Sequence, residues 1–199
     1  MLVFPVEMSE TYDERAKVTA APGRLELVRR FLNTRDIEHQ IDALETSRGA
    51  HRWLVAHSLI RRNARVTDRD RLGLIELRES LRALAHSHNG YPLAREELVR
   101  LNRQAANASI GAVFRGSDDV QLVRGKGDVR DAVSALLAIV CDSIRDGTWS
   151  RLKACRDVET CGWAFYDQSR NRVGTWCSMS VCGNRAKTRA YRDRHRTDS

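Results

Sequence analysis

Four cysteines in the C-terminal quarter of the chain limit its possible folds more than any other feature. Cys155 and Cys161 enclose five residues, Cys177 and Cys182 enclose four, and fifteen residues separate the two pairs. Two close pairs across a gap of hairpin length allow a metal ion to hold a fold that has little apolar mass. Four thiolates complete a tetrahedral shell around zinc and leave no position open for a substrate. The spacing therefore predicts one structural Zn²⁺ ion, and the alternative is four incidental free thiols.

The fifth cysteine, Cys141, lies outside this pattern. Its neighbours Leu137, Ile139, Val140 and Ile144 are apolar. We therefore predict that Cys141 is a buried core residue and takes no part in metal binding.

Positive charge is concentrated in the part of the chain that carries the four cysteines. The chain has a formal net charge of +8, and residues 151–199 contribute 11 Lys or Arg against 5 Asp or Glu. Such an excess indicates a polyanionic partner without naming it. With 42% hydrophobic and 30% charged residues, the composition is that of a globular protein, which excludes wholesale disorder.

A predicted helix after Cys182 carries most of these cations. At 100° per residue, four of its arginines share a stripe about 60° wide, suited to a phosphate backbone or to the major groove of double-stranded DNA. Asn184 lies in its first turn, where it either reads a base or caps the helix. The alternative for the whole helix is a solvated charged face. The predicted DNA-binding residues are Asn184, Arg185, Lys187, Arg189, Arg192, Arg194 and Arg196, with Arg170 and Arg172 in the loop between the cysteine pairs.

The rest of the chain predicts a mainly helical domain with one small β-hairpin. Apolar residues at helical spacing predict helices over 24–34, 50–63, 68–87, 95–108 and 128–145, and β-like runs at 110–114 and 120–123 predict the hairpin. The fold class is therefore α+β, with a C-terminal module formed by a β-hairpin or knuckle and a basic helix. The predicted division is a lead-in at 1–21, a sensing or dimerisation domain at 22–147, and a four-cysteine module at 148–199.

Five residues of the helical domain are candidates for binding a small-molecule effector. Asn33, Thr34 and Asp36 offer polar groups, Trp53 an apolar wall, and Arg78 an anchor for an anion. The alternative is a capped helix end beside a core tryptophan. The sequence shows no nucleophile–base motif and no histidine spacing typical of a catalytic metal, so we do not expect an enzyme.

The C-terminal run WCSMSVCGNRAKTRAYR, preceded by GWAFYDQSRNR, resembles the CGNR zinc-finger family of bacterial proteins, through Cys182-Gly183-Asn184-Arg185. Residues 25–38, LELVRRFLNTRDIE, resemble the start of the stress-response domain that usually precedes this finger. The resemblance implies a transcription regulator whose finger binds DNA and whose N-terminal domain senses a small molecule. The first cysteine pair encloses one residue more than the family pattern, which lengthens the knuckle.

These observations together predict a zinc-dependent, DNA-binding transcription regulator in the cytoplasm, associated with the nucleoid. One small finger would bind weakly, so we expect a homodimer or a second contact surface. The alternatives are a small-molecule enzyme or a protein-interaction module, each with a purely structural finger. No secretory signal or membrane-spanning run is visible. Because metal binding supplies the folding energy of such small units, Cys177→Ser is expected to unfold the C-terminal module and spare the helical domain.

Overall fold

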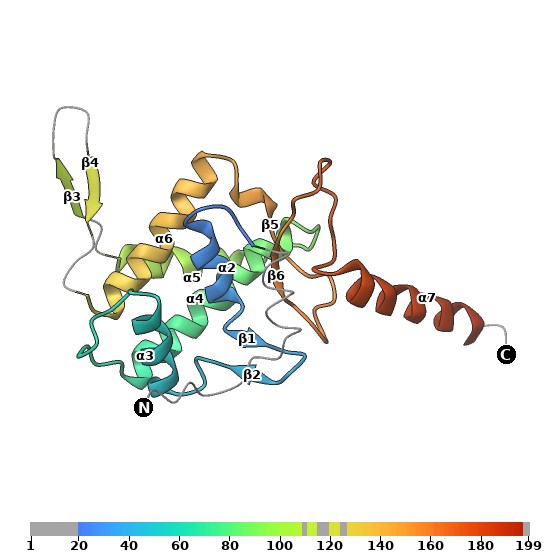
Figure 1. The fold of residues 1–199 in the computed structure, drawn as a ribbon, viewed down its shortest axis with the longest axis horizontal. Coiled ribbons are helices and arrows are strands. Elements are labelled where there is room, and N and C mark those ends of the chain that lie inside the picture. Colours follow the sequence, from blue (N-terminus) through green and yellow to red (C-terminus); the bar gives the residue numbers. More distant parts are fainter. Residues whose placement is uncertain (1–19, 109–110, 115–119, 124–126, 197–199) are drawn as a thin grey trace.

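The computed structural model describes residues 20–108, 111–114, 120–123 and 127–196 (Figure 1). Most of the predicted lead-in and the tip of the predicted hairpin lie outside these residues. The α-helices are α2 (Leu25–Leu32), α3 (Ser47–Ala56), α4 (Asp68–Ser87), α5 (Arg95–Ala106), α6 (Val129–Arg145) and α7 (Asn184–Arg196). A 3₁₀ turn at Trp149–Arg151 and a π-helical turn at Met179–Gly183 lie in the C-terminal part.

The strands form three antiparallel pairs among the described residues. They are β1 (Arg35–Asp36) with β2 (Ile41–Asp42), β3 (Gly111–Phe114) with β4 (Val120–Val123), and β5 (Leu152–Ala154) with β6 (Ala164–Tyr166). In the last pair Leu152 faces Tyr166 and Ala154 faces Ala164. The α+β class with a helical N-terminal part and a C-terminal four-cysteine module is thus confirmed.

Helix α4 is the long central element, and its start is fixed by its own sequence. The Thr67 hydroxyl accepts from the Asp70 amide, while the Asp70 carboxylate accepts from the Thr67 amide. This reciprocal cap satisfies two amides that would otherwise lack partners. Leu74, Leu77 and Leu81 then recur on one face and are fully buried or nearly so. Helix α4 therefore spans the residues predicted for it.

Helix α3 differs from the prediction of 50–63. It begins earlier because the Thr46 hydroxyl accepts a hydrogen bond from the amide of Gly49 and so caps the helix. Glycine is required at position 49, since a Cβ there would lie 2.5 Å from the carbonyl oxygen of Ala43. The helix ends earlier because Ser58 adopts a left-handed backbone with φ of 55°. Leu59 and Ile60 are buried beyond that turn, so an irregular segment fills core space that the sequence assigned to a helix.

The prediction for Cys141 is wrong. Helix α6 buries Leu136, Ile139 and Val140, but Cys141 and Ile144 are exposed. Because successive residues turn by about 100°, Cys141 rotates away from the face that carries Val140.

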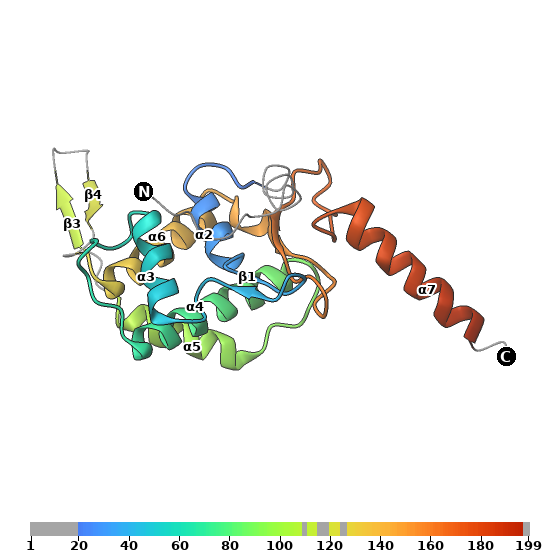
Figure 2. The same ribbon diagram turned by 60° about the horizontal axis from the view of Figure 1, so that its bottom comes forward.

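One apolar core crosses the predicted boundary at 147/148. Leu152, Ala154 and Ala164 of the β5–β6 pair belong to the same buried cluster as Val28 of α2 and Leu81 of α4. A smaller second cluster contains the four cysteines with Trp163 and Phe165, so these aromatic rings belong to the core of the finger. Helix α7 extends away from this body and ends far from it (Figures 1 and 2). Among the described residues, no helix combines the length and apolar character needed to cross a membrane.

Candidate metal centre and basic helix

The four predicted cysteines converge on one point. Cys155 directly follows β5, Cys161 lies shortly before β6, and Cys177 and Cys182 flank or occupy the π-helical turn before α7. Their sulfur atoms all lie within 4.8 Å of one another, and all four residues are buried. The Sγ atoms of Cys161 and Cys177 are 3.5 Å apart, and those of Cys177 and Cys182 are 3.7 Å apart. These distances exceed the S–S bond of about 2.0 Å, so the cysteines are free thiols.

The geometry fits a tetrahedral zinc ion. Four sulfurs at about 2.3 Å from a central ion lie about 3.8 Å from one another, close to the separations found here. The four thiols also differ in how readily they lose a proton. Hydrogen bonds from Cys161, Cys177 and Cys182 lower the pKa of the Cys155 thiol, whereas the hydrogen bond with Cys155 raises the pKa of the Cys161 thiol. A bound divalent cation would replace the remaining protons, because thiolates and not thiols ligate metals.

The finger is joined to the helical body by buried hydrogen bonds. The Asn33 side-chain amide donates to the Ala164 carbonyl at 2.9 Å and accepts from the Ala164 amide at 2.7 Å. Arg82 of α4 donates to the Gly162 carbonyl at 2.6 Å and to the carbonyl of Leu32. These two side chains therefore hold the knuckle between Cys155 and β6 against the ends of α2 and α4.

Asn89 and Lys153 order the segment that leads to Cys177. The Asn89 amide donates to the carbonyls of Ala154 and Thr175 at 2.9 and 2.8 Å. Lys153 pairs with Asp167 at 2.8 Å, and the two side chains are only 5% and 3% exposed. Burial raises the Asp167 pKa, but hydrogen bonds from Lys153 and Ser169 outweigh it and lower the pKa to about 2. The carboxylate thus stays ionised and holds the loop in place.

Two predicted DNA-binding arginines are engaged with acidic side chains at the base of α7. Arg185 pairs with Glu38, from the turn between β1 and β2, and Arg189 pairs with Asp157 of the knuckle at 3.0 Å. The Asn184 amide donates to the Ser180 carbonyl at 2.9 Å and so braces the π-helical turn. These three side chains fix the direction in which α7 leaves the finger.

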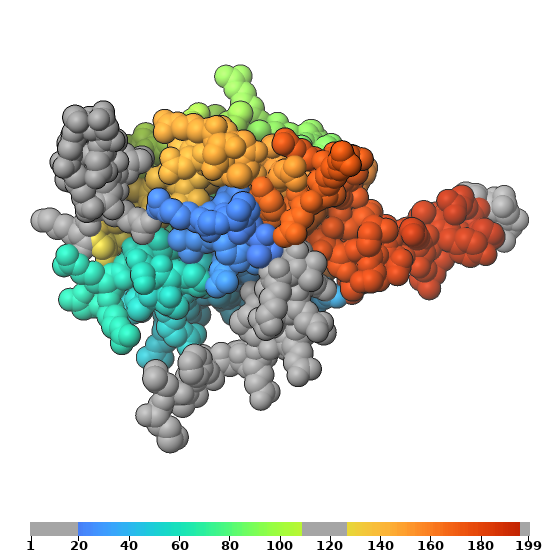
Figure 3. Space-filling view, turned by 45° about the horizontal axis from the view of Figure 1, so that its top comes forward, coloured from blue at the N-terminus to red at the C-terminus, as the bar shows by residue number. Residues whose placement is uncertain are grey.

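The remaining predicted contacts lie elsewhere on α7 or in the loop before it. Lys187, Arg192 and Arg194 are exposed on α7, as are Arg170 and Arg172 in the loop. Arg196 is the last residue of the helix. In the space-filling view the helix stands clear of the body along most of its length (Figure 3). Its distal turns are therefore open to a partner.

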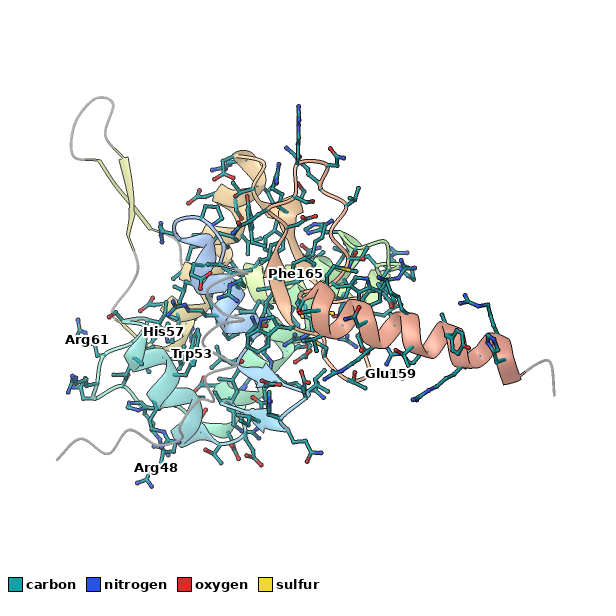
Figure 4. All side chains as sticks on the ribbon, turned by 45° about the vertical axis from the view of Figure 1, so that its right-hand side comes forward. Arg48, Trp53, His57, Arg61, Glu159 and Phe165 are labelled. Carbon is teal, nitrogen blue, oxygen red and sulfur yellow. The ribbon has the colours of Figure 1, made fainter. Side chains whose placement is uncertain are left out.

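The five predicted effector residues do not surround a common cavity. Asn33 clamps Ala164, and Thr34 and Asp42 accept from Arg78, whose guanidinium is 1% exposed and makes two bonds to Asp42 at 2.6 and 2.8 Å. The Asp36 carboxylate bonds the His39 ring at 2.8 Å. Trp53 stacks on His57 with ring centroids 4.1 Å apart (Figure 4). Among the described residues each of these side chains therefore has a neighbour as its partner, and Thr34 and Arg78 bond each other.

A hollow among the described residues lies elsewhere, between α4, α5 and α6. It encloses about 760 Å³. Leu72, Ile75, Val129 and Val133 supply an apolar floor, and Gln104 a polar group at its edge. No local sequence pattern indicates this hollow, because its lining comes from three helices that are brought together only by the fold.

The burial of His57 beside Trp53 makes the free energy of unfolding depend on pH. Burial lowers the His57 pKa, although the hydrogen bond to the Trp53 carbonyl opposes it. The unfolded chain therefore takes up a proton first as pH falls below about 6.5, and the free energy of unfolding decreases. We expect His57→Gln to reduce this decrease in urea unfolding measured above and below that pH. An NMR titration of the His57 ring with a midpoint at or above 6.5 would contradict the prediction.

Comparison with protein families agrees with this architecture. The CGNR zinc-finger family matches residues 151–195, which include the four cysteines and nearly all of α7. The ABATE family, described as "Putative stress-induced transcription regulator", matches residues 25–146, more than half of the chain. The comparison with curated proteins gives no match. The chain therefore belongs to the ABATE family and carries a CGNR zinc finger at its C-terminal end.

Proposed function

We propose that the protein is a zinc-dependent transcription regulator in which α7 contacts the phosphate backbone of double-stranded DNA. The observation that carries this proposal is the projection of α7 from the finger, with Lys187 exposed in its first turn and Arg192 and Arg194 exposed on its distal turns. A helix of this diameter fits the major groove, and its cations gain free energy by releasing counterions from DNA.

Zinc has a structural role in this proposal. Cys155, Cys161, Cys177 and Cys182 would hold one ion in a closed shell, which provides no site for metal-activated water. The ion would fix the knuckle and the π-helical turn, from which Asn184, Arg185 and Arg189 set the course of α7. The proposal is accordingly for a binding protein and not for an enzyme.

The helical body would supply sensing and assembly. The hollow between α4, α5 and α6 has the size of a small-molecule site, and its lining combines apolar residues with polar and charged ones. A homodimer would bring two α7 helices to one DNA segment and compensate for the few cations on each. Sedimentation equilibrium tests the dimer, and a change in melting temperature with candidate ligands tests the hollow.

The DNA contact is tested by removing two exposed cations of α7. For Lys187→Gln with Arg192→Gln, we expect the slope of log affinity against log salt to become shallower by about 1.8, since each phosphate contact contributes about 0.9. The measurement is fluorescence anisotropy with a labelled duplex at several salt concentrations. Arg95→Gln with Arg145→Gln is the control, because both are exposed arginines of the helical body and the change in charge is equal.

Sequence specificity requires a separate readout. Selection of bound fragments from genomic DNA should enrich a motif with the wild-type protein and lose it with the α7 variant. Salt-dependent binding without enrichment would indicate a general polyanion binder. Equal slopes for the α7 variant, its control and the wild type would refute the role of α7.

A further inference from the structure

A second group of cations lies on the helical body. Residues 48–69 contain six arginines and no lysine, against one acidic residue, Asp68. All six are exposed, and none of them forms an ion pair with another described residue. We call this group the arginine face; it consists of Arg48 and Arg52 on α3, Arg61, Arg62 and Arg65 in the α3–α4 loop, and Arg69 on α4.

The backbone beneath the arginine face is held in place. The Arg61 amide donates to the Gly127 carbonyl at 3.0 Å, and the Arg62 carbonyl bonds the His51 ring at 3.0 Å. Leu59 and Ile60, just before them, are buried in the main core. The loop is therefore ordered by its main chain and its apolar residues, while its guanidinium groups extend to solvent. A charged surface that is already ordered loses little entropy when it binds.

Two helix N-termini lie under the same surface. Helices α3 and α4 begin side by side, because the Ser47 hydroxyl at the start of α3 donates to the Asp68 carboxylate at the start of α4 at 2.9 Å. Asp68 also pairs with Arg71 at 2.9 Å, and Asp70 is occupied by the Thr67 cap. These two carboxylates are thus committed to other partners. The six arginines and the two helix ends together give a positive potential.

The arginine face is on the opposite side of the body from α7. Figure 1 places α3 at one end of the molecule and α7 at the other, and in Figure 4 Arg48 and Arg61 extend outward from the α3 end. The side chains of α7 therefore cannot supply charge to this face. It must be explained as a surface of its own.

We propose that the arginine face is a second DNA-contact surface, which binds the phosphate backbone without reading base sequence. Guanidinium forks match phosphate oxygens in charge and geometry. A protein partner is less suitable, because protein interfaces have apolar centres and the large apolar side chains of residues 47–69 are at most half-exposed. The inference rests on the proposed function, in that both concern DNA. The added claim is that one chain binds two DNA segments at once, or two separate parts of one long DNA molecule.

The test separates this surface from α7. It begins with the full-length Lys187→Gln, Arg192→Gln variant, in which the α7 contact is weakened. Anisotropy with a labelled duplex of arbitrary sequence, at several salt concentrations, should still show salt-dependent binding. Adding Arg48→Gln and Arg52→Gln should make the slope of log affinity against log salt shallower by about a further 1.8. Adding Arg95→Gln and Arg145→Gln in their place should leave the slope unchanged, and thermal melts confirm that each variant is folded.

Each outcome decides between the two surfaces. If the α7 variant has no residual binding, or if the arginine-face and control variants have equal slopes, the second surface is refuted while the α7 proposal stands. If the α7 substitutions have no effect and the arginine-face substitutions remove binding, the proposed role of α7 fails and the second surface stands. If polyglutamate is bound as tightly as DNA of equal charge and the same arginines are required, the partner is an acidic polypeptide and the inference is overturned.

Discussion

Cys177→Ser should unfold most of the chain and not only its C-terminal module. Zinc binding to a four-cysteine site is worth about 10–16 kcal/mol in apparent free energy, whereas a whole domain is stable by about 5–15 kcal/mol. Without the ion, the knuckle would release Asn33 and Arg82 and expose the β5–β6 residues that lie in the main core. The sequence alone predicts that the helical domain survives, because it does not show this shared core.

The measurement compares zinc content with two melting curves. Metal analysis should give one zinc ion per wild-type chain and less in the variant. In the variant, two thermal unfolding transitions should disappear together. Far-UV circular dichroism follows that of the helices, and tryptophan fluorescence follows that of the surroundings of buried Trp163 and the other tryptophans. Cys141→Ser is the control, since Cys141 is exposed and outside the cluster. A helical transition at the wild-type temperature in Cys177→Ser would show that the two parts are independent.

Arg82→Met should lower the free energy of unfolding by about 3–5 kcal/mol, the cost of breaking a buried charged contact. The Arg82 side chain is 7% exposed. It donates hydrogen bonds to the carbonyls of Leu32 and Gly162 and forms an ion pair with Glu79. Methionine fills much of the same volume but donates no hydrogen bond. It therefore leaves two carbonyl groups unpaired at the junction between body and finger.

The free energy of unfolding of Arg82→Met is measured by urea unfolding in excess zinc. The control is Arg100→Met, which removes an exposed pair with Glu97 and should cost less than about 1 kcal/mol. Equal midpoints for both variants would mean that Arg82 contributes nothing beyond packing. A loss confined to zinc affinity, with unchanged urea midpoints, would place its effect in the finger alone.

The parts of the fold that were predictable are those specified by neighbouring residues. The Thr67–Asp70 cap fixes the start of α4, and cysteine spacing identifies the four thiols that converge. Helix periodicity likewise locates α6. In each case the controlling interaction spans only a few residues or depends on a type of ligand with a strict geometry.

The parts that were missed depend on contacts between distant residues. Nothing near Asn33 indicates that its partner is Ala164, and nothing near Arg185 indicates Glu38. The polar residues predicted for an effector site instead join elements together, because a buried polar group must find a partner wherever the fold provides one. The shared core across residue 147 was missed for the same reason.

The anchoring of Arg185 and Arg189 makes α7 a lever. Glu38 and Asp157 fix the base of the helix, whose 13 residues extend for about 20 Å. A tilt of about 10° at the base therefore moves the tip by about 3.5 Å, comparable to the spacing of roughly 3.4 Å between charges along one DNA strand. A small displacement of the β1–β2 turn is thus magnified into a shift of one phosphate at the far end of the helix.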